Sequence, residues 1–155
     1  MRYTIDIVTS MIGASRRGFC PATIAWLLTD SRSLCFPDET LFFALQGKRD
    51  GHEYIRDLYD KGVRNFVVSR LPDRMDDYLE SNFLLVKDTL LALQTLAMAH
   101  RKEFSIPVIG ITGSNGKTIV KEWLYQLLEQ NYVVTRSPKS YNSQIGVPLS
   151  VWLMN

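Results

Sequence analysis

The 155-residue sequence is poor in features that mark several large protein classes. It has only two cysteines, Cys20 and Cys35, and two histidines, His52 and His100, and none stands at metal-ligand spacing. No apolar run approaches the roughly 18 residues needed to cross a bilayer. Eighteen basic and sixteen acidic residues give a net charge of +2, and the basic residues are scattered. These absences argue against a metal centre built from cysteine and histidine, a membrane-inserted protein and a nucleic-acid-binding surface.

The start of the sequence also lacks the parts of a signal peptide. It has no charged start followed by an apolar stretch and a small-residue cleavage site. Hydrophobic residues make up 46% and charged residues 22%, as in a globular protein. We therefore expect a cytoplasmic protein with reduced cysteines, forming one ordinary domain or a small domain plus part of another.

A glycine-rich segment near the end of the sequence is its most informative motif. Gly110-Ile-Thr-Gly-Ser-Asn-Gly-Lys-Thr118 follows the apolar run 106–109 and precedes a strongly helical stretch. This order is typical of a loop whose backbone N–H groups bind phosphate oxygens together with the N-terminus of the next helix. Lys117 would place a charge on the outer phosphates, and the Thr118 hydroxyl would coordinate a bridging Mg²⁺. The motif predicts a protein that handles a nucleoside triphosphate.

This segment departs from the common phosphate-loop pattern G-x-x-x-x-G-K-[ST]. Ile111 stands where the first glycine is expected, and glycines stand at 110 and 113 instead. The simpler interpretation is a turn followed by a helix N-cap. A turn alone would not need Lys117 and Thr118 in register with a preceding buried strand, so a variant phosphate loop is favoured.

Residues 1–104 are expected to form a mixed α/β domain. Three segments have helical spacing: 4–12, closed by Gly13; 53–61, ended by Gly62; and a long helix capped by Asp88 that reaches about Lys102. Strands are predicted where short runs are apolar or alternate between apolar and polar residues. These runs are 23–29, with Ile24, Trp26 and Leu28 on one side, and then 41–45, 66–68 and 83–86.

Residues 105–155 are expected to begin a second domain, a nucleotide-binding domain with a parallel sheet. The change of composition after residues 101–103 marks the boundary. A strand at 106–109, a helix at 117–130 and a strand at 132–135 would give parallel pairing through a right-handed connection. A further helix is expected from Val147 to Met154. Two strands are too few for a buried parallel sheet, so we expect the chain to be cut inside this domain.

Three stretches of the sequence resemble the Mur ligases, the ATP-dependent amide-forming enzymes of bacterial cell-wall precursor synthesis. Residues 111–118 look like the family's own phosphate loop, which accounts for the missing glycine. Residues 30–32, with 37–47 and 50–52, are similar to the N-terminal domain of the ligases that act late in the pathway. Residues 142–148 resemble the asparagine-containing segment of the family's ATPase domain. Together these stretches span nearly the whole chain.

The resemblance implies an activity and its substrates. Lys121-Glu122 and Ile145–Pro148 look most like the ligase that adds D-alanyl-D-alanine to UDP-N-acetylmuramoyl-tripeptide. In that reaction ATP phosphorylates the terminal carboxylate of the peptide, and the amine of D-alanyl-D-alanine attacks the acyl phosphate. The nearest competitor is the preceding ligase, which adds the third amino acid. Some members carry a fused alanine racemase downstream, and the resemblance leaves such a fusion open.

The resemblance also implies roles for individual residues. Lys117 would stabilise the charge that moves from the γ-phosphate, and Thr118 would hold Mg²⁺. Ser31 and Arg32 would contact the uridine nucleotide, with the Arg32 fork suited to a diphosphate. Asn142 would contact the substrate or the water shell of the metal. The expected ATP-binding residues are Gly113, Ser114, Asn115, Gly116, Lys117, Thr118 and, through its backbone N–H, Ile119.

Several alternatives stay open at the level of sequence. Ser140 and Ser143 stand where the family often has asparagine. The modified lysine, the acidic metal ligands and the third domain of the family are not present, so this polypeptide alone is expected to be inactive. It could instead be a UDP-sugar-binding module without chemistry, an unrelated phosphate-loop NTPase or a folate-polyglutamate ligase. The last two do not explain the N-terminal stretches. For Asp50-Gly-His52 we favour a turn at which His52 begins a helix.

Overall fold

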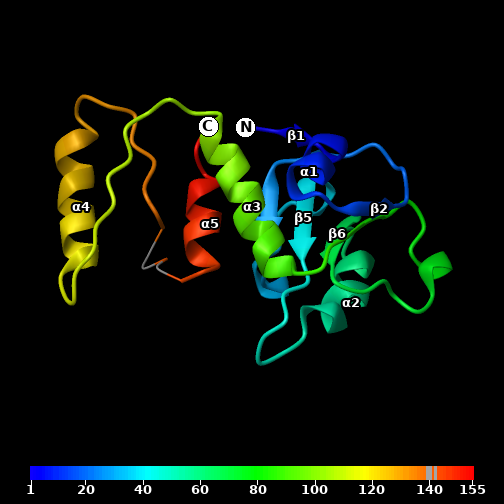
Figure 1. The fold of residues 1–155 in the computed structure, drawn as a ribbon. Helices are drawn as coiled ribbons and strands as arrows, with labels where there is room; N and C mark the ends of the chain where they lie inside the picture. The colour runs from blue at the N-terminus through cyan, green and yellow to red at the C-terminus, as the bar shows by residue number, and fades with distance from the viewer. Residues whose placement is uncertain (139–140, 142) are drawn as a thin grey trace. The chain divides into compact units, whose positions relative to one another are not determined.

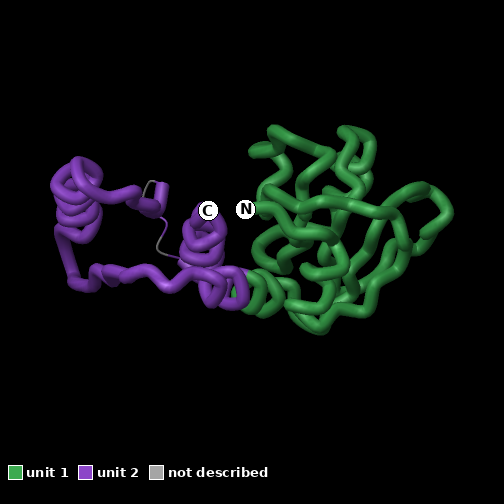
Figure 2. Tube along the Cα trace, turned by 90° about the horizontal axis from the view of Figure 1, so that it is seen from above, with its two compact units in different colours: residues 1–96 green, residues 97–155 purple. Residues whose placement is uncertain are grey.

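The computed structural model describes residues 1–138, 141 and 143–155, so Asn142 is the one predicted site residue that lies outside the described residues. The chain divides into two compact units, residues 1–96 and 97–155 (Figure 2). The predicted mixed α/β class is confirmed, and the larger sheet, which lies in the first unit, is mostly parallel (Figure 1). Within the described residues, no helix is long and apolar enough to cross a membrane.

The first unit is built on a five-stranded sheet with the order β2-β7-β6-β5-β4. Four strands run parallel, and β2 pairs antiparallel with β7 at one edge. A separate pair, β1 with β3, forms a small antiparallel sheet. The strands are β1 Tyr3–Thr4, β2 Ser15–Arg17, β3 Thr23–Ile24, β4 Trp26–Leu28, β5 Thr40–Phe43, β6 Asn65–Val68 and β7 Asn82–Leu85.

Two helices begin at residues whose side chains cap them, and one of the two also ends at a glycine cap. The Thr4 side chain accepts from Ile7 N at the start of α1 (Ile5–Ile12), and Gly13 ends this helix in the left-handed conformation. Asp88 accepts from the backbone N–H groups of Leu90 and Leu91 at 2.8 and 2.9 Å and so caps α3 (Thr89–Lys102), as predicted. The remaining elements are α2 Ile55–Asp60 and the 3₁₀ turns η1 Ser31–Ser33, η2 Pro37–Glu39, η3 Gly51–Tyr54 and η4 Met75–Asp77.

The core of the first unit lies on the central strands. All four residues of β5 and all four of β6 are buried, as expected for parallel strands that are covered on both faces. Phe66 stacks on Phe83 with ring centroids 5.1 Å apart. From α2, Ile55 and Leu58 pack into this cluster. The sheet is therefore held mainly by apolar contact.

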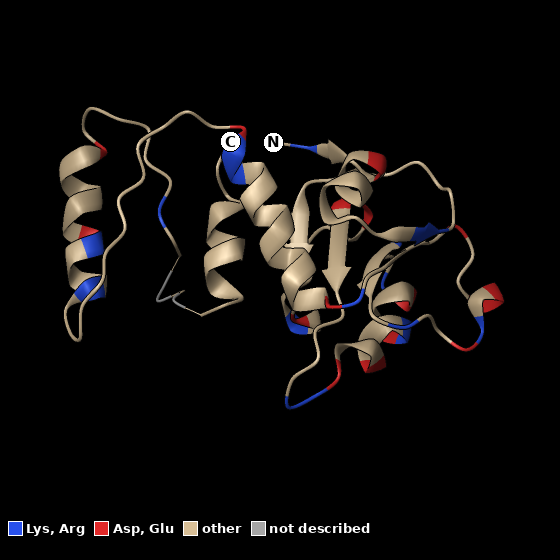
Figure 3. Cartoon of the chain, in the orientation of Figure 1, with Lys and Arg blue, Asp and Glu red and all other residues tan. Residues whose placement is uncertain are grey.

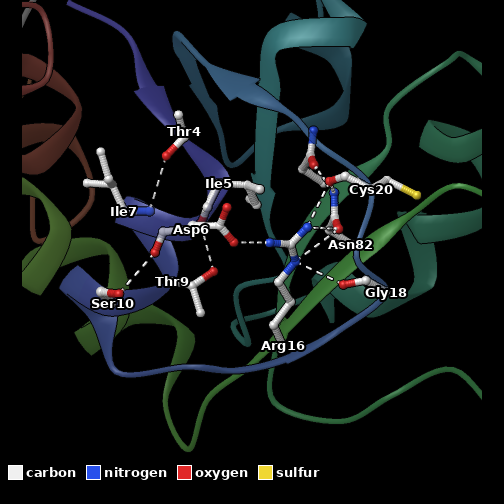
Figure 4. Close-up of polar contacts among 11 residues, drawn as sticks. Thr4, Ile5, Asp6, Ile7, Thr9, Ser10, Arg16, Gly18, Cys20 and Asn82 are labelled. Atoms are coloured by element: carbon white, nitrogen blue, oxygen red, sulfur yellow. Dashed lines mark hydrogen bonds and ion pairs between the residues drawn. The ribbon is translucent and has the colours of Figure 1, made fainter.

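A largely buried arginine on the edge strand β2 is bonded to the start of β7 and to the segment that follows β2 (Figure 4). The Arg16 side chain is 10% exposed and forms an ion pair with Asp6. Its Nε donates to Gly18 O at 2.9 Å, and its Nη2 donates to Cys20 O and to Asn82 Oδ1, both at 2.8 Å. The charge is thus buried with all these acceptors around it, which offsets the cost of removing it from water. This network fixes the segment from Gly18 to Cys20.

The prediction of one strand over residues 23–29 is wrong. Ile24 is in β3 and pairs with Tyr3, whereas Trp26 begins β4 and pairs with Thr40. Between them, Ala25 N donates to Glu39 O at 3.0 Å. The chain therefore passes from one sheet to the other within three residues. Alternation of side chains continues through such a transition, so the periodicity could not reveal it.

The second unit contains the end of α3 and two further helices, α4 (Lys117–Leu128) and α5 (Gly146–Val151). Both were predicted, the first with its start at Lys117. The expected strands at 106–109 and 132–135 are not formed. Val108 is 63% exposed and Val133 is fully exposed. A parallel strand needs a neighbour for its backbone groups, and among the described residues of this unit neither run finds one.

The helix α4 has its predicted apolar face but buries no residue of it. Trp123 is 64% exposed and Leu127 is 67% exposed. Tyr125 is covered on one side by the Arg136 guanidinium, which lies 4.0 Å from its ring centroid. Lys121 donates to Ser137 O at 2.9 Å, and Glu122 pairs with Arg136. Polar contacts therefore join α4 to residues 136–137, while its apolar face stays open.

A histidine forms the packed centre of the second unit. His100 is 1% exposed, its Nε2 lies 3.0 Å from Met154 O, and its ring contacts Phe104 and Trp152. Since a carbonyl accepts only from an N–H, Nε2 carries the proton of the neutral ring. Burial lowers the pKa of His100 below its ordinary value of 6.5.

Lowering the pH from 7.5 to 5 is expected to destabilise the packing around His100. The unfolded chain takes up a proton as the pH falls through about 6.5, whereas the folded state resists protonation, so stability decreases in this range. Thermal unfolding followed by circular dichroism at both pH values measures the effect. The His100→Gln variant, which cannot titrate, should lose less stability between the two values. Equal losses of stability in the two proteins would contradict the conclusion that His100 is buried in its neutral form with a lowered pKa.

Candidate functional site

The predicted phosphate loop forms an exposed turn that leads directly into α4. Gly116 is the N-cap of this helix and has φ 77°, a left-handed conformation that favours glycine. The first helical hydrogen bond runs from Val120 N to Gly116 O at 3.0 Å. The N–H groups of the first turn of α4 have no acceptor from a preceding helical turn, and they carry the positive end of the helix dipole. This local geometry suits phosphate oxygens.

Lys117 is folded back over the loop. Its Nζ donates to Gly113 O and, at 3.3 Å, to Ser114 O. The ammonium therefore sits at the loop itself, beside the start of α4, where a phosphate would meet it. Thr118 follows in the first turn of α4, the position from which a hydroxyl would reach a phosphate-bound Mg²⁺. The residues present therefore fit both a phosphate and a Mg²⁺ ion.

Ser31 and Arg32 lie in the first unit, in η1 just after β4. Asp30 caps this turn by accepting from Arg32 N at 3.1 Å. The same carboxylate accepts from Arg32 Nε at 2.9 Å and from Nη2 at 2.6 Å, a bidentate pair. These hydrogen bonds from the Arg32 side chain and backbone lower the pKa of Asp30 to about 2. Arg32 is 86% exposed in its side chain, so its guanidinium is held in place but accessible.

A second polar cluster lies at the ends of β5 and β6, and the sequence did not predict it. Asp50 Oδ1 accepts from His52 N at 3.0 Å and from His52 Nδ1 at 2.6 Å, and Asp50 Oδ2 accepts from Arg70 Nη2 at 2.5 Å. On its other side, His52 Nε2 accepts from Ser69 N at 3.1 Å. Hydrogen bonds from His52 N and from Arg70 lower the pKa of Asp50 well below its usual range. The carboxylate therefore stays ionised.

The turn predicted at residues 50–52 is present, with Asp50 as the cap of η3 and His52 within it. A Cβ on Gly51 would lie 2.7 Å from Leu45 N, so no side chain fits at this position. The sequence signal for the wider cluster was the charged residue Arg70, which stands two residues after the end of the predicted strand 66–68. Its partner is 20 residues away in sequence, and only the sheet brings the two together.

The predicted site residues fall into two groups, one in each unit. Gly113 to Ile119 come together in the second unit as one continuous loop and helix start, whereas Ser31 and Arg32 lie in the first. Asn142 lies outside the described residues.

A pocket of about 270 Å³ opens beside Arg70 in the first unit. It is lined by His52, Glu53, Ile55, Arg70, Leu71, Pro72, Asp73 and Tyr78.

Comparison with known proteins connects both groups to one family. Residues 111–155 match the Mur ligase middle domain. The chain is 38% identical over 128 residues, 81% of its length, to the UDP-N-acetylmuramoyl-tripeptide--D-alanyl-D-alanine ligase of Bacillus subtilis. It is 32% identical over 149 residues, 96% of its length, to the ligase of the same name from Escherichia coli. It spans 27% and 31% of these two relatives.

Solved structures that are similar to this chain come from the same family as these relatives. A crystal structure of MurF from Acinetobacter baumannii covers 100% of the chain with a TM-score of 0.90 at 27% identity, and the chain covers 34% of it. The MurF ligase from Thermotoga maritima in complex with ADP matches 81% of the chain with a TM-score of 0.68 at 33% identity, and the chain covers 28% of it. The matches cover both units and include the phosphate loop, and the chain therefore belongs to the Mur ligase family.

Proposed function

We propose that this chain contributes the uridine-nucleotide domain and the phosphate loop of a ligase that adds D-alanyl-D-alanine to UDP-N-acetylmuramoyl-tripeptide. The observation that carries the proposal is the loop from Gly113 to Thr118, with Gly116 capping α4 and Lys117 over the loop. The curated relatives described above carry the name of this activity. In this proposal residues 1–104 bind the UDP-linked peptide and residues 105–155 begin the ATP-binding domain.

The residues of the chain have separate tasks in this reaction. The first turn of α4 and Lys117 bind and orient the phosphates of ATP, and they stabilise the charge that develops as the terminal phosphoryl group leaves. Mg²⁺, held by Thr118 and the phosphates, would supply further neutralisation of that charge. Ser31 and Arg32 hold the uridine nucleotide, and Asn142 contacts the substrate or the water shell of the metal. The residue types at these positions suit those tasks.

Product formation by the full-length ligase tests this proposal. With MgATP, UDP-N-acetylmuramoyl-tripeptide and D-alanyl-D-alanine, we expect ADP release that needs both other substrates and yields the UDP-linked pentapeptide. If the enzyme instead added a free amino acid to the UDP-linked dipeptide with equal efficiency, the preceding ligase would be the better assignment.

The 155-residue chain alone should not turn over, and sustained tripeptide-dependent ADP release by it would contradict this. If the chain bound a uridine nucleotide but neither it nor the full-length protein bound ATP, the module without chemistry would be supported.

A further inference from the structure

The carboxyl ends of three neighbouring strands bring two paired arginines to one edge of the sheet. β4, β5 and β6 are parallel neighbours, so their carboxyl ends lie on the same edge. Asp30 and Arg32 follow β4, Asp50 follows β5, and Arg70 follows β6. In open α/β sheets, ligands bind outside this edge. Adjacent strands are separated by about 4.8 Å, so β4 and β6 are about 10 Å apart, within reach of two arginine side chains.

Arg70 is held at this edge by its own side chain and by the backbone of the preceding residue. The backbone N–H of the preceding residue, Ser69, donates to His52 Nε2 at 3.1 Å. The guanidinium donates to Asp50 at 2.5 Å, and Asp50 is itself bonded to the His52 ring. The His52 side chain is only 6% exposed, so this support is buried. Arg70 is therefore ordered before any ligand binds, which reduces the entropy that it would lose on binding.

The guanidinium of Arg70 keeps donors for a ligand. The side chain is 57% exposed, and Asp50 engages Nη2 of a group that has five N–H donors. Arg32 has the same arrangement, since Asp30 caps a 3₁₀ turn and also pairs with the arginine. The edge carries further positive charge in the loop that follows β5, which contains Lys48 and Arg49 (Figure 3). Paired guanidinium groups are suited to bidentate contact with phosphate oxygens.

The pocket beside Arg70 is a less suitable place for an anion. Glu53 and Asp73 are among its lining residues, and their carboxylates would repel a phosphate inside it. At the end of β6, the carboxylate next to the exposed part of Arg70 is that of Asp50. Its charge is offset by the ion pair with Arg70 and by the hydrogen bond to His52, so it repels a phosphate less. The anion is therefore placed across the sheet edge, between Arg70 and Arg32.

We propose that Arg70 is a second guanidinium contact for the diphosphate of the uridine nucleotide, and that Asp50 and His52 are positioning residues that hold it. The proposal rests on the proposed function, because it takes the nucleotide from there. Arg32 alone could serve a single phosphate, whereas Arg32 and Arg70 together recognise two. The pair thereby makes the site selective for a nucleoside diphosphate over a monophosphate.

Calorimetric titration of the 155-residue chain with UDP and with UMP tests this proposal. The wild-type chain should bind UDP more tightly than UMP. Arg70→Ala should weaken UDP binding by about tenfold or more, as expected for loss of a charge-assisted hydrogen bond, and UMP binding by much less. The ratio of the two affinities should therefore fall. Arg70→Lys should restore part of the ratio, and Asp50→Asn should lower it while the arginine stays present.

The matched control is Arg56→Ala. Arg56 is also exposed and also pairs with an aspartate, Asp60 at 3.2 Å, but it lies on α2 away from the strand ends. This variant should keep the wild-type ratio. A well-folded Arg70→Ala chain with an unchanged UDP-to-UMP ratio would overturn the proposal while leaving the proposed function intact. A wild-type chain that binds neither nucleotide would instead remove the uridine site from the proposed function, and the role of Arg70 with it.

Discussion

Replacing Lys117 with alanine is expected to reduce turnover by the full-length ligase by about 10³-fold, the scale of losing one preorganised group that stabilises developing charge. The fold should be unaffected, because within the described residues Lys117 Nζ bonds to two carbonyls of its own exposed loop, Gly113 O and Ser114 O, and to no other element. The rate of ADP release with both substrates present measures the loss. The melting temperature of the variant should match that of the wild type.

Lys61→Ala is the matched control for this experiment. Lys61 is also an exposed lysine with a polar contact, a 2.7 Å pair with Asp57, and its side chain is 51% exposed. It caps the end of α2 in the first unit, outside the segments that we assign to nucleotide binding. Its loss should leave the rate of ADP release unchanged. Normal turnover by the Lys117→Ala variant would show that the loop is a simple turn and helix cap.

The elements that could be predicted from the sequence are those with local causes. Thr4 and Gly13 bound α1, Asp88 caps α3, and Gly116 precedes α4, because each cap is a contact between residues close in sequence. The candidate phosphate loop was recognised for the same reason, since its glycines, lysine and threonine lie within six residues of sequence, and its binding of phosphate stays a prediction. Local chemistry was sufficient for these features.

The features that could not be predicted depend on partners distant in sequence. Residues 106–109 have the composition of a strand, but a strand forms only where another strand supplies the hydrogen bonds. The pairing of Asp50 with Arg70 spans 20 residues and depends on the register of β5 and β6. Neither residue type is unusual by itself. Only the sheet topology shows that the ends of β4, β5 and β6 form one edge.

The segment after β2 shows how a tertiary contact determines a single residue. Gly18 has φ 82°, and a Cβ built on it would lie 1.9 Å from Ser81 O. The two backbones approach here because Arg16 binds Gly18 O and Cys20 O on one side and Asn82 on the other. No side chain can occupy that space unless the backbone moves. Gly18 is therefore required both by its conformation and by this contact.

Gly18→Ala is accordingly expected to lower the free energy of unfolding by about 2–4 kcal/mol, because strain at positive φ adds to a displaced backbone and weakened bonds to Arg16. Gly13→Ala is the control. Gly13 also has a positive φ, 60°, but no atom lies within 4 Å of the added Cβ, so its loss should be about 1 kcal/mol. Urea unfolding followed by circular dichroism measures both changes. Equal losses at the two glycines would mean that the Gly18–Ser81 approach contributes nothing, and that backbone conformation alone determines the cost.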